Sequence, residues 1–236
     1  MTPPARTAVQ PDAPAPALLK AAPGVHLVAV EEDIVVLDLQ ADQYNCLLDA
    51  AGLVQIAPDG HLLPRDAAVA AALLDGGLAV PAFGVAPERR RGFIPPARDL
   101  PGDASPSGPV ATVTPGALHT LLTLARAGHA FERQTLAAMV AERPAPGPAS
   151  RPVDPTHLAH IVAAARRLRP WLPREGECLK RAFQLRALLA RHGVEADWIF
   201  GVRTWPFAAH CWLQVDDLVV GDRLERVRLY TPILRA

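Results

Sequence analysis

Three residues in the C-terminal half have the types and the order needed for nucleophilic catalysis. Cys178 begins a leucine-rich segment that is predicted to be helical, where unpaired backbone amides and the helix dipole favour a thiolate. His210 follows 32 residues later at the start of a predicted strand, and Asp222 follows after another 12 residues. Together they supply a nucleophile, a base and an orienting carboxylate. Taken alone, Cys178 has the alternative of being a small core residue, and Asp222 has the alternative of being an ordinary turn residue.

Two tryptophans and another cysteine lie close to His210. Alternation along the predicted strand puts His210 and Trp212 on one face and Cys211 on the other. Cys211 is therefore expected in the core rather than as a partner of His210. Trp205, in the loop before the strand, and Trp212 are candidates to line a substrate cleft, and the alternative for them is core packing.

Cysteine usage and apolar segments set expectations about compartment and metal. The 3 cysteines show no CxxC or Cys/His zinc spacing, and their odd number favours a reducing compartment. Residues 1–20 lack the apolar core of a signal peptide, and the uncharged, alanine-rich residues 67–74 are too few to span a bilayer. We expect a cytoplasmic protein with no metal site and no membrane partner.

The elements that must position the candidate triad come as helices followed by strands. Helical periodicity predicts a first helix that starts at Thr114-Pro115. Three more helices are predicted at residues 131–143, 155–169 and 178–192. The period then switches to strands at residues 196–203, 210–215 and 218–222, with a tight turn at Asp216-Asp217. This half is predicted to be α+β.

The N-terminal half shows strands first. Residues 25–30, 34–39 and 43–48 read as a three-stranded meander, followed by predicted helices at 49–56 and 65–74 that glycines end. This order suggests a small winged-helix-like unit.

Proline clusters mark the expected boundaries. Most of the 25 prolines fall in residues 1–24, 81–115 and 144–155, and proline-rich segments suit extended linkers. We expect a disordered head at 1–24, a first domain at 25–85, a linker at 86–112 and a second domain at 113–236.

The charges are divided unevenly along the chain. The formal net charge is zero, with 24 basic and 24 acidic residues, but residues 25–85 contain one base and nine acids. A DNA-reading domain presents basic side chains to phosphates, so this composition argues against a nucleic-acid partner.

The spacing of the motifs resembles one family. The chain carries Cys178-Leu-x-Arg181, then Gly201-Val-Arg-x-x-Pro-Phe-x-Ala-His210-x-Trp212, then Asp222. This pattern is similar to that of the lasso peptide biosynthesis B protein, whose C-terminal half is a transglutaminase-like, papain-like cysteine protease. The resemblance implies a leader peptidase in which Cys178 attacks, His210 acts as base and then acid, and Asp222 orients His210. Cys211 departs from the pattern, at a position expected to be small.

The same resemblance extends to the first half, which is similar to the PqqD-like leader-recognition element. It implies that the leader of a ribosomally made precursor adds as a strand beside residues 43–48 and rests against the last helix. The implied leader-binding residues are Gln43, Tyr44, Asn45, Cys46, Leu47, Val69 and Leu73. It further implies that the core passes to an asparagine-synthetase-like, ATP-dependent macrolactam cyclase. No GxxxxGK[ST] phosphate loop occurs in this chain, so no cofactor is expected to bind here and any ATP requirement falls to the cyclase.

Two other functions stay open at this point. The triad could serve a transglutaminase-like amidase or acyltransferase that acts on another peptide and never cuts a backbone. Alternatively, the chain could be a non-enzymatic winged-helix binding module, which the acidic first half disfavours.

Overall fold

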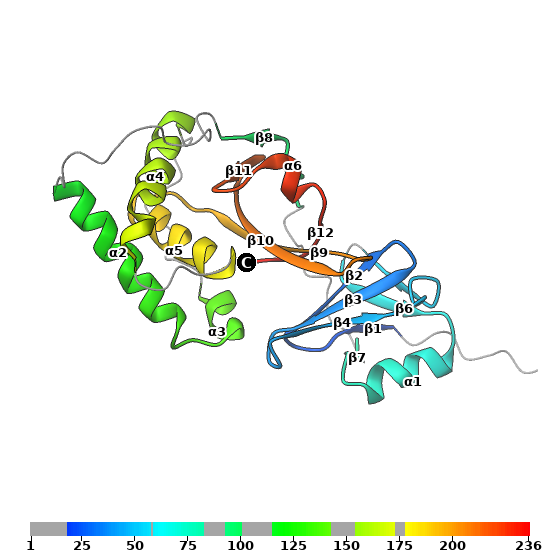
Figure 1. The fold of residues 1–236 in the computed structure, drawn as a ribbon. Helices are drawn as coiled ribbons and strands as arrows, with labels where there is room; N and C mark the ends of the chain where they lie inside the picture. Colours follow the sequence, from blue (N-terminus) through cyan, green and yellow to red (C-terminus); the bar gives the residue numbers. More distant parts are fainter. Residues whose placement is uncertain (1–17, 58, 83–92, 101–114, 143–153, 173–177) are drawn as a thin grey trace, which may run out of the picture.

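The computed structural model describes residues 18–57, 59–82, 93–100, 115–142, 154–172 and 178–236. In these ranges the chain forms three β-sheets and a layer of helices (Figure 1). The N-terminal elements are β1 (Leu19–Ala21), β2 (Val25–Val30), β3 (Asp33–Asp38), β4 (Gln43–Leu47), β5 (Val54–Ile56), β6 (His61–Pro64), α1 (Ala67–Asp75) and β7 (Ala79–Pro81). The C-terminal elements are β8 (Arg98–Asp99), α2 (Pro115–Phe131), α3 (Leu136–Ala141), α4 (Pro155–Leu168), η1 (Arg169–Trp171), α5 (Cys178–Arg191), β9 (Asp197–Arg203), β10 (Ala208–Val215), β11 (Leu218–Val220), α6 (Leu224–Val227) and β12 (Thr231–Arg235).

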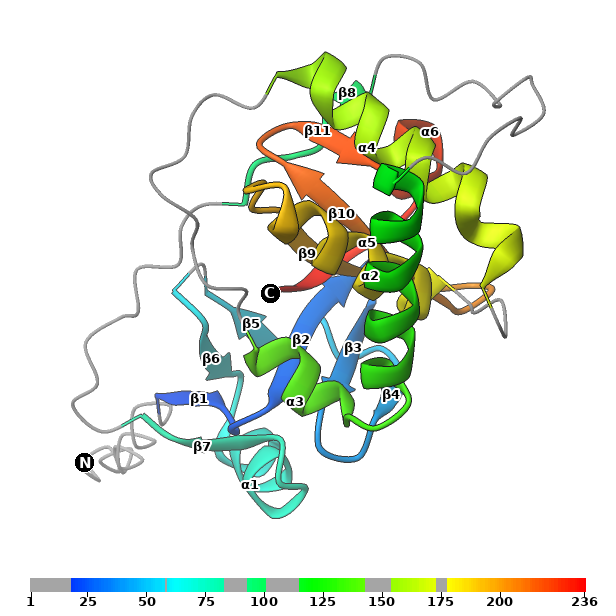
Figure 2. The same cartoon turned by 90° about the vertical axis from the view of Figure 1, so that its left-hand side faces the viewer.

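The C-terminal part is built on a five-stranded sheet in the order β12-β9-β10-β11-β8. All neighbouring strands are antiparallel except β11 and β8. The helix α5 packs on β10, and α2 and α4 pack on α5, so one face is covered by helices (Figure 2). On the opposite face Ile199, Trp212 and Val219 form a small cluster with Val227 of α6. The predicted α+β class is confirmed for this half.

The N-terminal part contains two sheets and one helix in the residues described. The meander β2-β3-β4 forms as predicted, with Val30 paired to Asp33 across the first turn and Asp38 paired to Gln43 across the second. A second sheet has the order β5-β6-β1-β7, and α1 packs on β6 and β7. Asp66 caps α1 by accepting a hydrogen bond from the Val69 amide at 2.9 Å.

The central strand β3 joins the two halves of the molecule. Its residues Ile34, Val35, Val36 and Leu37 are all 0 % exposed. Val35 and Leu37 belong to the large core that includes the helices and β9–β10, whereas Ile34 and Val36 belong to the core under α1. Because successive side chains of a strand point to opposite faces, the β2-β3-β4 sheet is a layer shared by both cores. Figure 1 shows this sheet between β1, β6 and α1 on one side and β9–β10 on the other.

Several boundaries differ from the expected ones. β1 lies within the expected disordered head, where it pairs with β6 and β7. Residues 93–100 lie within the expected linker, yet β8 pairs with β11, Arg98 forms a two-pronged ion pair with Asp217, and Leu100 is buried in the large core. Proline-rich neighbours therefore do not prevent strand pairing in these segments: β1 pairs on both sides, between β6 and β7, and β8 is the edge strand beside β11. The other residues of the head and linker lie outside the described ranges.

Two predicted helices are also incorrect. Residues 49–56 form turns and β5 instead of a helix, since Val54 and Ile56 pair with β6. The predicted helix at 131–143 is shorter, because Phe131 ends α2 and Thr135 caps α3. Among the described residues, 18–82 hold seven strands and the single helix α1, so the winged-helix-like description does not match this unit.

Candidate active site

The start of α5 meets the open edge of β10. Cys178 is the first residue of α5, where backbone amides and the helix dipole favour an anion. β11 pairs only with residues 213–215 of β10, and in the described part of the chain no strand covers that edge of β10 at residues 210–212. Cys178 therefore lies beside His210 and Cys211, and the three residues line one cavity.

His210 and Asp222 form a close pair. The His210 Nε2 atom lies 2.5 Å from the Asp222 Oδ2 atom, and the His210 side chain is only 2 % exposed. The amide of Arg223 donates a hydrogen bond of 2.8 Å to the other oxygen of Asp222. Because Nε2 is engaged by Asp222, Nδ1 is the ring nitrogen available to Cys178. The structure thus brings Cys178, His210 and Asp222 together from three elements.

The electrostatics favour an ion pair between Cys178 and His210. Hydrogen bonds from Cys211 and then from His210 outweigh burial and lower the pKa of Cys178 to about 4. Burial disfavours the imidazolium, but the hydrogen bonds to Asp222 and Cys178 outweigh it and raise the pKa of His210 to about 9. Burial acts against the Asp222 carboxylate, yet its hydrogen bond to His210 lowers the pKa of Asp222. Between these pKa values the site holds a thiolate and an imidazolium.

Two aromatic rings fix the orientation of His210. Trp212 stacks 6.3 Å from the imidazole and Tyr230 lies 5.2 Å from it. Gly201, opposite His210 on β9, makes room for both side chains: a Cβ atom there would lie 2.7 Å from the Trp212 ring and 2.9 Å from the Tyr230 Cβ atom. Gly221, with φ of +78°, forms the turn that leads into Asp222. Sequence reasoning did not find Tyr230, because nothing in its local sequence marks it.

A cavity of about 150 Å³ opens at the triad. Its walls come from η1, α5, β10, β11 and α6, and three of the lining residues are arginines, namely Arg169, Arg181 and Arg226. Arg226 lowers the pKa of His210 through its charge, although its effect is smaller than that of Asp222. Trp212 lines this cavity from beneath and is 2 % exposed, whereas Trp205 is not among the lining residues.

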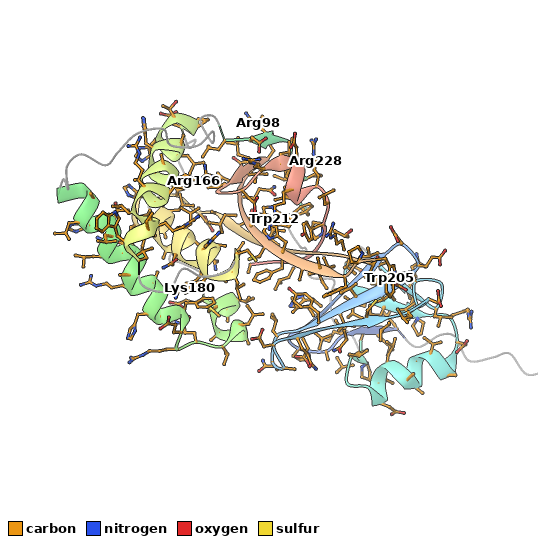
Figure 3. All side chains as sticks on the ribbon, in the orientation of Figure 1. Arg98, Arg166, Lys180, Trp205, Trp212 and Arg228 are labelled. Carbon is orange, nitrogen blue, oxygen red and sulfur yellow. The ribbon has the colours of Figure 1, made fainter. Side chains whose placement is uncertain are left out.

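Trp205 instead contacts the N-terminal sheet. Its indole Nε1 donates a hydrogen bond of 2.9 Å to the buried carboxylate of Asp33, while its side chain remains 68 % exposed (Figure 3). The neighbouring Phe207 lies 6.0 Å from the ring of Tyr44 on β4. The loop between β9 and β10 therefore bridges from the candidate active site to β3 and β4.

The residues expected to bind a leader fall into different environments. Tyr44 and Cys46 pack against the large core, Leu47 packs against the core under α1, and Gln43 and Asn45 are exposed. Burial, followed by the negative charge of the nearby Cys178 thiolate, raises the pKa of Tyr44, so its phenol stays neutral. Among the strands described, β4 is at the edge of its sheet.

The two residues of α1 that were expected to bind a leader, Val69 and Leu73, belong to the core under α1. Leu73 is 5 % exposed and belongs to the core, and Val69 packs against the same core. α1 packs on β6 and β7, and Leu47 of β4 packs against the same core as Val69 and Leu73, so their part in binding a leader stays a prediction.

Comparison with protein-family models matches residues 118–235 to the transglutaminase-like superfamily, which is half of the chain. The chain belongs to the transglutaminase-like superfamily. Searches of the curated proteins and of the solved structures each found no match. Transglutaminase-like proteins are usually cysteine-type enzymes, and the matched range contains Cys178, His210 and Asp222.

Among the residues that the structure describes there is neither a cluster of metal-binding side chains nor a membrane-spanning helix. Within those ranges, no three or more His, Cys, Asp or Glu side chains are grouped so that they could hold a metal ion. No helix in the same ranges has the length and apolar character needed to cross a membrane.

Proposed function

We propose that this transglutaminase-like protein is the leader peptidase of a lasso peptide pathway, which binds the leader of a ribosomally made precursor and cleaves it from the core. The observation that carries the proposal is the Cys178–His210–Asp222 geometry, in which a thiolate at a helix start faces an imidazolium held by a carboxylate. The motif spacing described above adds the resemblance to the lasso B protein, and the superfamily match supports cysteine-type acyl chemistry.

In the proposed mechanism Cys178 attacks the carbonyl carbon of the last leader residue. The tetrahedral oxyanion forms beside the start of α5, where the backbone amide of Cys178 is the natural first donor. His210 then gives its proton to the amine of the core as the C–N bond breaks, which leaves the leader as a thioester on Cys178. His210, now neutral, takes a proton from water, the hydroxide attacks the thioester, and the leader leaves as a carboxylate. Asp222 keeps the imidazole oriented throughout.

The proposed leader site is the edge of β4. A peptide that adds there as a strand would gain backbone hydrogen bonds, with Gln43, Asn45 and Leu47 on one face of the extended sheet and Tyr44 and Cys46 on the other. Such a strand would lie next to the loop that holds Trp205 and Phe207, which leads directly into His210. The acidic surroundings, including Asp42 and Asp49, favour a leader that carries basic residues.

The remaining parts of the proposal concern partners. The released core, with its new amino terminus, is the substrate that an asparagine-synthetase-like cyclase would need, and ATP would be consumed by that partner. The proposed hydrolysis itself uses only side chains of this chain and water, and it takes place in the cytoplasm.

The proposal is tested with the full chain and the precursor peptide encoded beside its gene. Mass spectrometry is expected to find a leader and a core fragment. The variants Cys178→Ala and His210→Ala should abolish both fragments while precursor binding, measured by fluorescence anisotropy, persists. Leu122→Ala serves as the control, because Leu122 is exposed on α2 and lies outside both the cavity and the proposed leader site. Undiminished cleavage by the Cys178→Ala protein contradicts the proposal.

A second candidate is an amidase or acyltransferase on another peptide, which the superfamily match favours equally. The same spectra separate the two functions. Hydrolysis of a backbone bond gives two fragments, whereas acyl transfer or deamidation changes the mass of a peptide that stays intact.

A further inference from the structure

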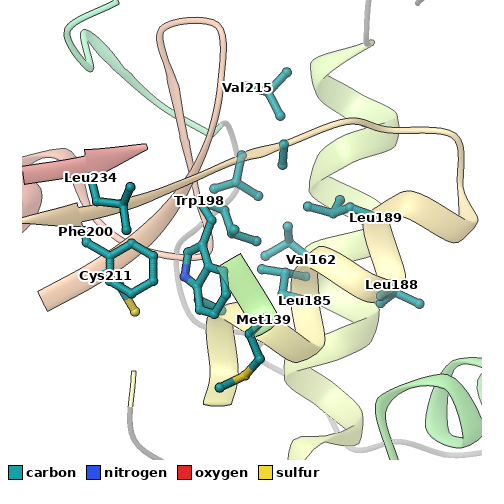
Figure 4. Close-up of a cluster of buried hydrophobic side chains, with 14 of the residues drawn as sticks. Met139, Val162, Leu185, Leu188, Leu189, Trp198, Phe200, Cys211, Val215 and Leu234 are labelled. Atoms are coloured by element: carbon teal, nitrogen blue, oxygen red, sulfur yellow. The ribbon is translucent and has the colours of Figure 1, made fainter. Parts of the chain in front are cut away.

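The strongest unassigned feature is a second thiol at the nucleophile. Cys211 is 4 % exposed and lies in the large core beside Phe200 and Trp198 (Figure 4). Cys178 packs against the same core, and both residues line the cavity at the triad. Each thiol also influences the other: Cys211 is the largest influence that lowers the pKa of Cys178, and Cys178 is the largest that raises the pKa of Cys211. The expectation that Cys211 is a core residue is therefore incomplete.

The topology explains how one strand serves Cys178 from both faces. His210 and Cys211 are consecutive on β10, so their side chains point to opposite faces of the sheet. Cys178 lies at the uncovered edge of β10, from which both faces and the backbone amide between them can be reached. One sulfur thus has His210 on one side and the Cys211 thiol on the other.

We propose that Cys211 is a positioning residue for the reaction, whose buried thiol donates a hydrogen bond to the Cys178 thiolate and holds it in the ionised, oriented form. The role is a donor's because burial in an apolar core disfavours ionisation of Cys211, and the neighbouring Cys178 thiolate disfavours it further. A thiol that keeps its proton can share it with a neighbouring thiolate. This inference concerns the chemical state of Cys178 and does not depend on which peptide is the substrate.

Several other titratable or charged groups lie near Cys178. The titratable or charged side chains around it are His210 and Asp222, Tyr44 from β4, and the cavity arginines Arg169, Arg181 and Arg226. The hydrogen bond from Cys211 is the largest single influence that lowers the pKa of Cys178, ahead of that from His210. Removing the donor thiol while these groups stay in place isolates its contribution.

The test measures the ionisation of Cys178 by its rate of alkylation with iodoacetamide, from about pH 3.5 to about pH 8, in the full chain. A Cys46→Ser background removes the other partly exposed thiol. Cys211→Ala removes the donor and leaves the backbone amide, and Cys211→Ser keeps a donor of similar size. We expect Cys211→Ala to move the midpoint of the alkylation profile upward by about one pH unit, a tenfold change in the thiolate-to-thiol ratio.

The serine variant distinguishes hydrogen bonding from packing. Cys211→Ser is expected to return the midpoint to within a few tenths of a pH unit of the parent value. A midpoint unchanged in a folded Cys211→Ala protein overturns the proposal. So does a Cys211→Ser midpoint that rises by a full unit, and this second result is decisive even if the alanine variant does not fold. Because no peptide is needed, these outcomes are independent of whether the leader-peptidase function is correct.

Discussion

A single substitution in the N-terminal sheet is expected to destabilise the C-terminal half. Val30, Val35, Leu37 and Leu39 all belong to the large core that holds the helices and β9–β10. A fully buried aliphatic side chain contributes about 1.5–3 kcal/mol, so these four residues provide about 6–12 kcal/mol of burial to that core. This compares with a net stability of about 5–15 kcal/mol for a whole domain. The two halves should therefore unfold together.

The perturbation is Leu37→Ala, which truncates a side chain that is 0 % exposed. It should lower the free energy of unfolding by about 2–5 kcal/mol. Urea unfolding is followed by tryptophan fluorescence, since all 4 tryptophans lie beyond residue 170. A Trp205→Phe background is used because Trp205 touches Asp33. Leu48→Ala, at a side chain that is 60 % exposed, is the control and should change little.

Because the two halves share a core, unfolding should be one cooperative transition that Leu37→Ala shifts as a whole. If fluorescence keeps its midpoint in the Leu37→Ala protein while circular dichroism shows a separate early transition, the halves are independent domains and the shared-layer account is refuted.

Three further predictions concern the surroundings of the site. Gly201→Ala should reduce kcat about 100-fold, because the added methyl group displaces the aromatic side chains that support the imidazole. Gly52→Ala is the control and should leave kcat unchanged, because an added Cβ atom there meets nothing within 4 Å. A steady-state assay measures both variants, and a fully active Gly201→Ala enzyme would contradict this role of the two side chains. The value of kcat/KM should rise with pH through about 4, where Cys178 ionises, and fall through about 9, where His210 loses its proton. Arg226→Gln should move the fall to higher pH, because it removes a positive charge that disfavours the imidazolium. A shift of the fall to lower pH would contradict this role of Arg226. Trp205→Phe should cost about 1–3 kcal/mol in thermal unfolding because it leaves the buried Asp33 with one donor fewer, and an unchanged Tm argues against that bond.

The site was largely predictable because its parts have strong local signals. Cys178 starts an amphipathic helix, His210 lies two residues into β10, and Asp222 follows a hairpin, so residue type and spacing alone indicated the constellation. Tyr230 and Arg226 were missed since their place beside His210 depends on how the chain returns after β11, which no local pattern encodes.

The relation between the two halves was not predicted, although one signal was present. The run Ile34-Val35-Val36-Leu37 is continuously apolar, which is typical of a strand buried on both faces, whereas a half-buried strand alternates. Because this run was interpreted as one strand of a simple meander, a second core on its other face was not predicted. The very short strands β1 and β7 are stabilised by pairing rather than by their own sequence, which explains why residues 19–21 were placed in a disordered head.

The central proposal is that Cys178 becomes acylated by the leader, and acid-quenched intact-mass spectrometry of the full chain with its precursor tests it most directly. The proposal predicts a transient protein species heavier by the leader acyl group, located on Cys178 by peptide mapping and lost in Cys178→Ala. Fragments that form at the same rate in Cys178→Ala, with no adduct on the parent protein at any time, would contradict it.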